Sequence, residues 1–357
     1  MNNIPRIGDK IVNHEIVRTT DANTPKNPLS TSAPAPDVNS AENNAAETSD
    51  QTEQKEYSLE QFKKDYKHIL RREVFFKLKP FEIERQKIFK SLTLLGIPLT
   101  IILTILIGIF CAKIGSFRLI VLPICIYIPL WQYCKKKLEN KVKNNMMPIL
   151  MNAVPNFEWT LSPVISKEDI IKTDLIPYLK NADCDIDDNF KGIYRGVDVL
   201  VSEQEYNVGS GKNRRTIYQG AIIKIHMNKK FEGLTLIRPR GIKKNQYKLE
   251  EVKLEDVEFS KKYQVFSDNQ IEARYLITTS FMERFQNIKT AYSASEIYAA
   301  FSDKYIFIAP RCYKDLFSLA HLSKTLIDEE QYDVLFKEFA SILALVDYFK
   351  LDKNLGL

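Results

Sequence analysis

Two long apolar runs, separated by only a few residues, constrain this chain more than any other feature of its sequence. They cover residues 92–112 and 117–134, and the short segment Lys113-Ile114-Gly115-Ser116 connects them. Each run is close to the roughly 20 residues that an α-helix needs to cross about 30 Å of hydrocarbon. The competing interpretation, two unusually apolar core helices of a soluble protein, leaves no polar face for water. We therefore predict a transmembrane helical hairpin over residues 91–134, with the lipid bilayer as its partner.

Basic residues around the two runs indicate how the hairpin is oriented. Only Lys113 and Arg118 lie at the connection, whereas lysines and arginines crowd both outer flanks. Cytoplasmic flanks of membrane helices are enriched in such residues. We therefore expect an inner (cytoplasmic) membrane protein of bacteria with two spans and both termini in the cytoplasm. The flanking basic residues are Arg71, Arg72, Lys77, Lys79, Arg85, Lys87, Lys90, Lys135, Lys136, Lys137, Lys141 and Lys143.

The segments on either side of the hairpin differ in texture. Residues 1–56 are rich in Asn, Thr, Ser, Ala, Pro and acidic side chains, a composition typical of a disordered tail, here cytoplasmic. Residues 57–90 predict an amphipathic pre-membrane helix that begins with a capping box at Ser58 and Gln61 and is interrupted at Pro80. Residues 135–153 predict a basic juxtamembrane helix that is kinked or broken at Pro148.

The remaining residues, 154–357, predict one cytosolic α+β domain. Apolar and polar residues alternate at 197–202 and 221–228, as in half-buried strands, and Gly209-Ser210-Gly211 between them suits a hairpin tip. We expect an antiparallel sheet with flanking helices. Further strands are predicted at 233–238, 263–266, 296–301 and 305–309, and helices at 166–180, 268–277, 280–289, 315–324 and 328–351.

Catalytic chemistry has no clear signature in this chain. The Gly209–Lys212 segment lacks the pattern of a phosphate-binding loop, because Tyr206 and Asn213 stand where glycine and serine or threonine are needed. The four histidines and five cysteines show no metal or catalytic spacing. We therefore predict no catalytic residue, no metal ligand and no cofactor. Glu203 and Glu205 have the spacing of paired carboxylates on one strand face, although a solvated face is the simpler interpretation. A pocket around Glu203, Glu205 or His226 would favour an enzyme.

Basic residues in the domain offer a different kind of site. An anionic membrane surface attracts nearby lysines and arginines by about 1 kcal/mol each. Ordinary solvated loops explain the same residues. Nucleic acid is not an expected partner, because the net charge of +6 is modest and no recognition motif is present. The candidate contacts to an anionic ligand are Arg214, Arg215, Arg238, Arg240, Lys243 and Lys244.

Three stretches of this sequence resemble a known family. They begin at Phe190-Lys191-Gly192-Ile193-Tyr194-Arg195-Gly196-Val197, at Tyr218-Gln219-Gly220 and at Tyr263-Gln264-Val265-Phe266. Together they resemble a bacterial membrane-protein family known as domain of unknown function 3137, over roughly residues 60–350. The resemblance implies a paired membrane run ahead of a soluble domain. It implies no activity, catalytic residue or cofactor.

Three hypotheses for function follow. The first is a membrane-anchored cytosolic adaptor or regulator that binds an unknown protein partner and has no catalysis of its own. The alternative is binding of anionic lipid headgroups or another phosphorylated ligand through the basic loops. The third is an enzyme with an unrecognised site.

Overall fold

A computed structural model of the chain describes residues 58–115, 118–242, 247 and 249–351. The chain divides into the units Met1–Gln54 and Lys55–Leu357, and every described residue belongs to the second. The tail predicted at residues 1–56 therefore lies outside the described residues, as do Lys243 and Lys244.

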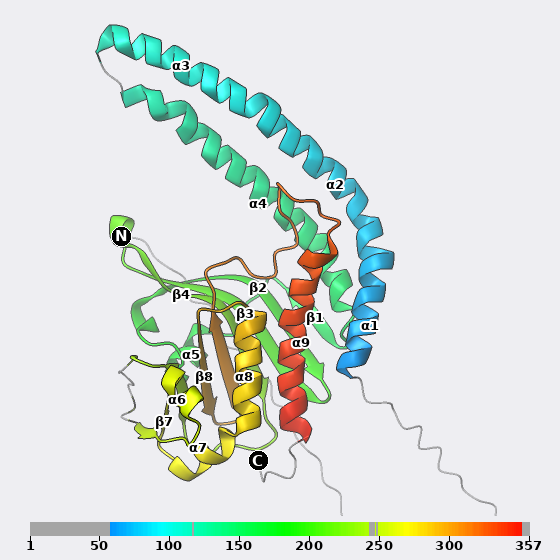
Figure 1. Ribbon diagram of the computed structural model, residues 1–357, viewed down its shortest axis with the longest axis vertical. Helices are drawn as coiled ribbons and strands as arrows, with labels where there is room; N and C mark the ends of the chain where they lie inside the picture. Colours follow the sequence, from blue (N-terminus) through cyan, green and yellow to red (C-terminus); the bar gives the residue numbers. More distant parts are fainter. Residues whose placement is uncertain (1–57, 116–117, 243–246, 248, 352–357) are drawn as a thin grey trace, which may run out of the picture. The chain divides into compact units, whose positions relative to one another are not determined.

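The described part opens with one continuous helix from Leu59 to Ile114, 56 residues long (Figure 1). It consists of α1 (Leu59–Ile69), α2 (Phe75–Lys90) and α3 (Ile97–Ile114), joined by π-helical turns at Leu70–Val74 and Ser91–Gly96. The Ser58 side chain accepts a hydrogen bond from the Gln61 backbone N–H, as predicted for the cap. Pro80 lies inside α2, so the predicted interruption there is wrong. Among the described residues this is the one helix long and apolar enough to cross a bilayer.

A second helix returns beside the first. After a 3₁₀ turn at Arg118–Val121, α4 runs from Leu122 to Met151 and continues through Pro148 without the predicted break (Figure 1). Gly96 leaves room for the Tyr127 ring, since a Cβ at this position would lie 2.7 Å from a ring carbon. The Tyr127 hydroxyl donates to the Leu92 carbonyl over 2.9 Å. The two apolar segments therefore pack against each other, although only the first half of α4 is apolar.

The domain that follows combines helices with one antiparallel sheet, as predicted. Nine strands of the described chain lie in the order β1-β2-β3-β4-β9-β8-β5-β7-β6, and every neighbouring pair is antiparallel. The strands are β1 (Phe157–Thr160), β2 (Asp183–Tyr194), β3 (Val197–Val208), β4 (Arg215–His226), β5 (Thr235–Pro239), β6 (Glu250–Val252), β7 (Tyr263–Ser267), β8 (Glu296–Ser302) and β9 (Tyr305–Arg311).

Helices cover the sheet unequally. One face packs against α1, α4, α8 (Thr279–Ala291) and α9 (Glu329–Leu351), and this core includes Phe62, Val201 and Phe339. The opposite face carries a smaller core under α5 (Lys167–Thr173). Two short helices, α6 (Val257–Lys262) and α7 (Gln270–Leu276), flank β7.

The segment 312–328 crosses the helical face without regular structure, so the helix predicted at 315–324 is wrong. Its backbone groups find partners in side chains instead. Glu203 accepts from the Leu316 N–H and Glu82 from the Leu326 N–H, both over 2.9 Å. Arg85 donates to the Leu322 carbonyl over 2.8 Å. Buried backbone groups need hydrogen bonds, and here side chains supply what a helix would otherwise provide.

Gly220 is required where β4 meets β9. Its φ is +156°, and a Cβ there would lie 2.1 Å from the Pro310 carbonyl oxygen and 3.1 Å from the Cys312 nitrogen. Any side chain at this position must push the two central strands apart.

We expect Gly220→Ala to destabilise the protein by about 1–3 kcal/mol, because the added methyl overpacks the β4–β9 pair. In a thermal unfolding scan this corresponds to a midpoint roughly 2–12 °C lower. Gly211→Ala is the control, since Gly211 has a φ of +56° but nothing within 4 Å of its Cβ position. Equal losses in the two variants would contradict the prediction.

Candidate functional site: an acidic cavity beside helix α4

An irregularity in β2 assembles a group of carboxylates. Along β2 and β3, Ile186 is paired with Gln204 and Asn189 with Ser202, so Asp187 and Asp188 together face the single residue Glu203. This is a β-bulge, two residues opposite one. Successive residues of a regular strand point to opposite faces. The extra residue lets both aspartates approach Glu203, and one carboxylate oxygen of each residue lies within 4.8 Å of the other two.

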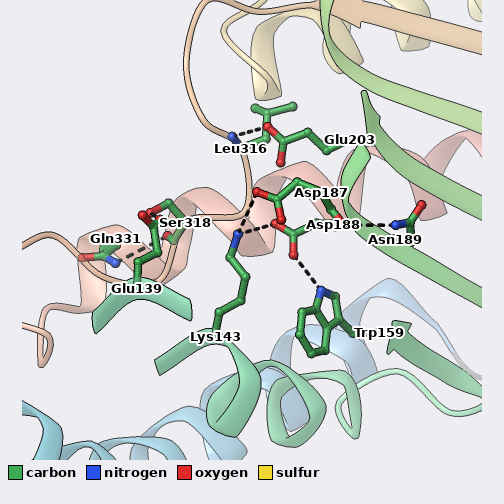
Figure 2. Close-up of polar contacts among 10 residues, drawn as sticks. All are labelled: Glu139, Lys143, Trp159, Asp187, Asp188, Asn189, Glu203, Leu316, Ser318 and Gln331. Atoms are coloured by element: carbon green, nitrogen blue, oxygen red, sulfur yellow. Dashed lines mark hydrogen bonds and ion pairs between the residues drawn. The ribbon is translucent and has the colours of Figure 1, made fainter. Parts of the chain in front are cut away.

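Lys143 of α4 supplies a positive charge to this group (Figure 2). Its ammonium lies 2.6 Å from Asp188 Oδ2 and 3.9 Å from an Asp187 oxygen. The other Asp188 oxygen accepts from the Trp159 indole N–H over 2.7 Å. Lys143 and Asp188 are buried, whereas Asp187 is about half exposed. The ion pair therefore ties α4 to the bulge inside the protein.

Glu203 has a buried carboxylate oxygen without a hydrogen-bond partner. It is 6% exposed; one oxygen accepts from the Leu316 N–H, and the other has no hydrogen-bond partner. Burial raises the pKa of Glu203 to about 9; the Leu316 hydrogen bond opposes this shift, and the charge of Asp315 adds to it. At neutral pH Glu203 therefore keeps its proton unless a cation beside it stabilises the carboxylate.

The same burial acts on the ion pair. Burial raises the pKa of Asp188 to about 6 despite the attraction of Lys143. Burial alone would lower the pKa of the Lys143 ammonium, but the charge of Asp188 and its hydrogen bond outweigh this and raise it. Lys143 therefore stays charged, and one ammonium faces three acids.

Lys143, Asp187 and Glu203 line a cavity of about 720 Å³ between α4 and strands β2 and β3. Its charged lining contains more acids than bases. The acids are Glu139, Asp185, Asp187, Glu203, Glu205 and Asp315, and the bases are Lys135, Lys136 and Lys143. Glu139 is anchored by a hydrogen bond from the Ser318 hydroxyl. The carboxylate oxygens of this lining can bind metal cations and ammonium or guanidinium groups.

Glu203 and Glu205 both line this cavity. A pocket around these residues is the observation that would favour an enzyme. His226 lies elsewhere, in a second hollow of about 650 Å³ together with Lys224 and Tyr305. The Lys224 ammonium is already held, 2.8 Å from Asp169 Oδ2 and 4.3 Å from the centre of the Tyr305 ring. The acidic cavity is therefore the stronger candidate site.

The basic residues chosen from the sequence do not form one surface. Arg238 is 0% exposed, and its guanidinium lies 2.8 Å from Asp174 Oδ2, so it is part of the interior and cannot meet a surface ligand. Arg214 and Arg215 are exposed at the β3–β4 tip, and Arg214 lies 3.1 Å from Asp185. Arg240 is held by the Ser260 carbonyl.

Sequence reasoning missed Asp187, Asp188 and Lys143 as site residues, and it predicted no strand where β2 lies. Asp and Asn are depleted in strands. One signal was present: in Asp183-Cys184-Asp185-Ile186-Asp187-Asp188 an acidic residue recurs at every second position until an extra aspartate breaks the alternation. An extra residue that interrupts a period-2 pattern indicates a β-bulge.

Part of the chain is similar to known proteins. Residues 216–351 match the family described as Protein of unknown function (DUF3137), which confirms the resemblance over that range. No curated protein matches the chain significantly. The crystal structure of the mycobacterial trehalose monomycolate transport factor A is similar at 13% identity, over 53% of this chain and 86% of that one. The TM-score of 0.29 is too low to indicate a shared fold.

Removing Lys143 should weaken the protein, because the buried Asp188 would then have to carry its charge without a partner or take up a proton. We expect Lys143→Met to lower the free energy of unfolding by about 3–5 kcal/mol, the usual effect of removing one partner of a buried ion pair.

Glu203→Gln should raise the unfolding midpoint instead, since it removes one of three crowded acids and keeps the acceptor for the Leu316 N–H. Thermal unfolding of the detergent-solubilised chain at pH 7.5 measures both effects. The interpretation fails if Glu203→Gln is as harmful as Lys143→Met.

Proposed function

We propose that this chain is a membrane-anchored binding protein that holds a cationic group of a ligand or partner in its acidic cavity. One observation carries the proposal: six carboxylates and three lysines line a hollow of about 720 Å³. Pockets of this size suit a small molecule or a few partner side chains. The family match assigns no activity, so the proposal rests on the site. In this reading the domain acts as an adaptor or regulator without a catalytic step.

The exposed apolar surface of the helices supports the membrane anchor. Leu94, Leu99, Ile105 and Ile109 of the long helix are each more than half exposed, as is Ile126 of α4. Soluble proteins rarely expose contiguous apolar surface of this kind. We propose that α3 and the first half of α4 cross the inner membrane of a bacterium twice. The flanking lysines and arginines favour a cytoplasmic location for both ends.

This placement puts the cavity near the lipid headgroups. Helix α4 changes from apolar to basic at Lys135, and the cavity residues Gln132, Lys135, Glu139 and Lys143 follow one another along it. A cationic partner held there would be bound close to the membrane surface.

Spermidine, a small polycation, tests the cavity. We expect it to bind the full chain in phosphatidylcholine nanodiscs, as measured by calorimetry, and to bind at least tenfold more weakly, about 1.4 kcal/mol, to the Asp185→Asn, Glu205→Gln double variant. Both residues line the cavity and neither is fully buried, so the fold should tolerate the change.

The control is Glu250→Gln with Glu255→Gln, which removes two exposed carboxylates in and beside β6, at the opposite edge of the sheet from β1 and β2. It should leave spermidine binding unchanged. If both double variants lose affinity equally, general surface charge explains the binding and the cavity is not the receptor.

Recognition of anionic headgroups is a second candidate, and the exposure of Lys212, Arg214 and Arg215 at one hairpin tip favours it. Basic groups of this kind are drawn to anionic lipid. We expect amide hydrogen exchange at residues 209–215 to slow in nanodiscs that contain phosphatidylglycerol, and Arg214→Gln with Arg215→Gln to remove the effect. Lys229→Gln with Lys230→Gln is the matched control. Equal exchange in neutral and anionic nanodiscs would eliminate this candidate.

A further inference from the structure

The three carboxylates at the bulge are spaced as ligands of a single ion. One oxygen from each of Asp187, Asp188 and Glu203 lies within 4.8 Å of the others. An oxygen-coordinated Ca²⁺ has ligands at 2.3–2.6 Å, so two ligands on opposite sides of the ion are roughly 4.6–5.2 Å apart. The bulge therefore brings the three oxygens within the coordination range of a hard divalent cation.

A second observation points to a ligand at the same place. The Glu203 oxygen that does not bind Leu316 is buried and has no hydrogen-bond partner. Figure 2 shows Glu203 turned toward Asp187 and Asp188 from the opposite strand. Nearly all buried polar atoms have a partner, and an exception calls for an explanation. A cation between the three carboxylates would supply the missing partner.

Charge leads to the same conclusion. Three carboxylates share one buried ammonium, that of Lys143, which leaves an excess of two negative charges when all are ionised. A divalent cation brings the sum to zero. Asp187 and Glu203 also line the cavity, which gives an ion a path from solvent and room for water ligands.

We infer that Asp187, Asp188 and Glu203 bind a hard divalent cation, of the Ca²⁺ or Mn²⁺ type, at the base of the acidic cavity. The inference rests on the proposed binding function and specifies part of its ligand. Lys143 is the neighbouring charge in this site: it holds Asp188 in place and repels the ion. The cation would then form part of the surface that a partner meets.

Mn²⁺ alone is the probe, added to the full chain in phosphatidylcholine nanodiscs after treatment with a chelator. Electron paramagnetic resonance measures free Mn²⁺, and we expect one site per chain that Ca²⁺ competes for. Asp187→Asn should weaken binding at least tenfold, and because Asp187 is half exposed its loss should not unfold the protein. Asp183→Asn is the matched control, an exposed acid on the same strand that does not line the cavity, and should change affinity less than twofold.

Lys143→Met provides a test that a purely structural role of the cluster would not pass. Removing the ammonium should tighten Mn²⁺ binding, and added Mn²⁺ should raise the unfolding midpoint of this variant more than that of the unchanged protein. Equal Mn²⁺ binding by Asp187→Asn and Asp183→Asn, or no saturable binding by the unchanged chain, would overturn the inference.

The outcomes separate this inference from the proposed function. If spermidine binding depends on Asp185 and Glu205 while Mn²⁺ does not bind, the proposed binding function is supported and the proposed metal site is wrong. If Mn²⁺ binding depends on Asp187 while spermidine does not bind, the metal site stands and the organic cation is the wrong ligand.

Discussion

The ion pair between Lys143 and Asp188 is the interaction on which the rest of this architecture depends. It joins the helix that leaves the apolar segment to the strand that carries the acidic bulge, over 2.6 Å and almost out of contact with water. A buried ion pair has to offset the cost of taking both charges out of water. Here Trp159 adds a hydrogen bond to Asp188, and the nearby α4 residues Val142 and Met146 are buried. The geometry of the site therefore depends on the position of α4.

Much of the fold follows from local pattern in the sequence. Alternation at residues 197–202 and 221–228 identifies β3 and β4, and the glycines at 209 and 211 lie at their turn. Strand β2 and the coil at 312–328 could not be predicted in the same way. In β2 the extra aspartate reverses the alternation, and in the coil the hydrogen-bond partners are Glu82, Arg85 and Glu203, far away in sequence. Only the folded chain brings those partners together.

The candidate site shows the same division. The spacing of Glu203 and Glu205 already indicated two acids on one strand face, but nothing local indicated that Lys143, about sixty residues earlier, would line the same cavity. Arg238 illustrates the opposite error, because a basic stretch suggested a surface and the structure buries that residue against Asp174. Charge in a sequence says what a side chain carries. Its environment depends on contacts between distant segments.

The continuous helix from Leu59 to Ile114 has a mechanical consequence. At about 1.5 Å per residue it is roughly 84 Å long. Its first turns belong to the domain core, where Phe62 stacks on Phe336 at 4.9 Å and the Tyr66 hydroxyl donates to the Tyr332 carbonyl, while its last turns are apolar and exposed. Membrane helices tilt when the thickness of the bilayer changes. With its apolar end in a bilayer, as proposed above, the helix would act as a lever on the core. A tilt would then move the turns that contact α9, and the two π-helical turns are points where the helix can bend.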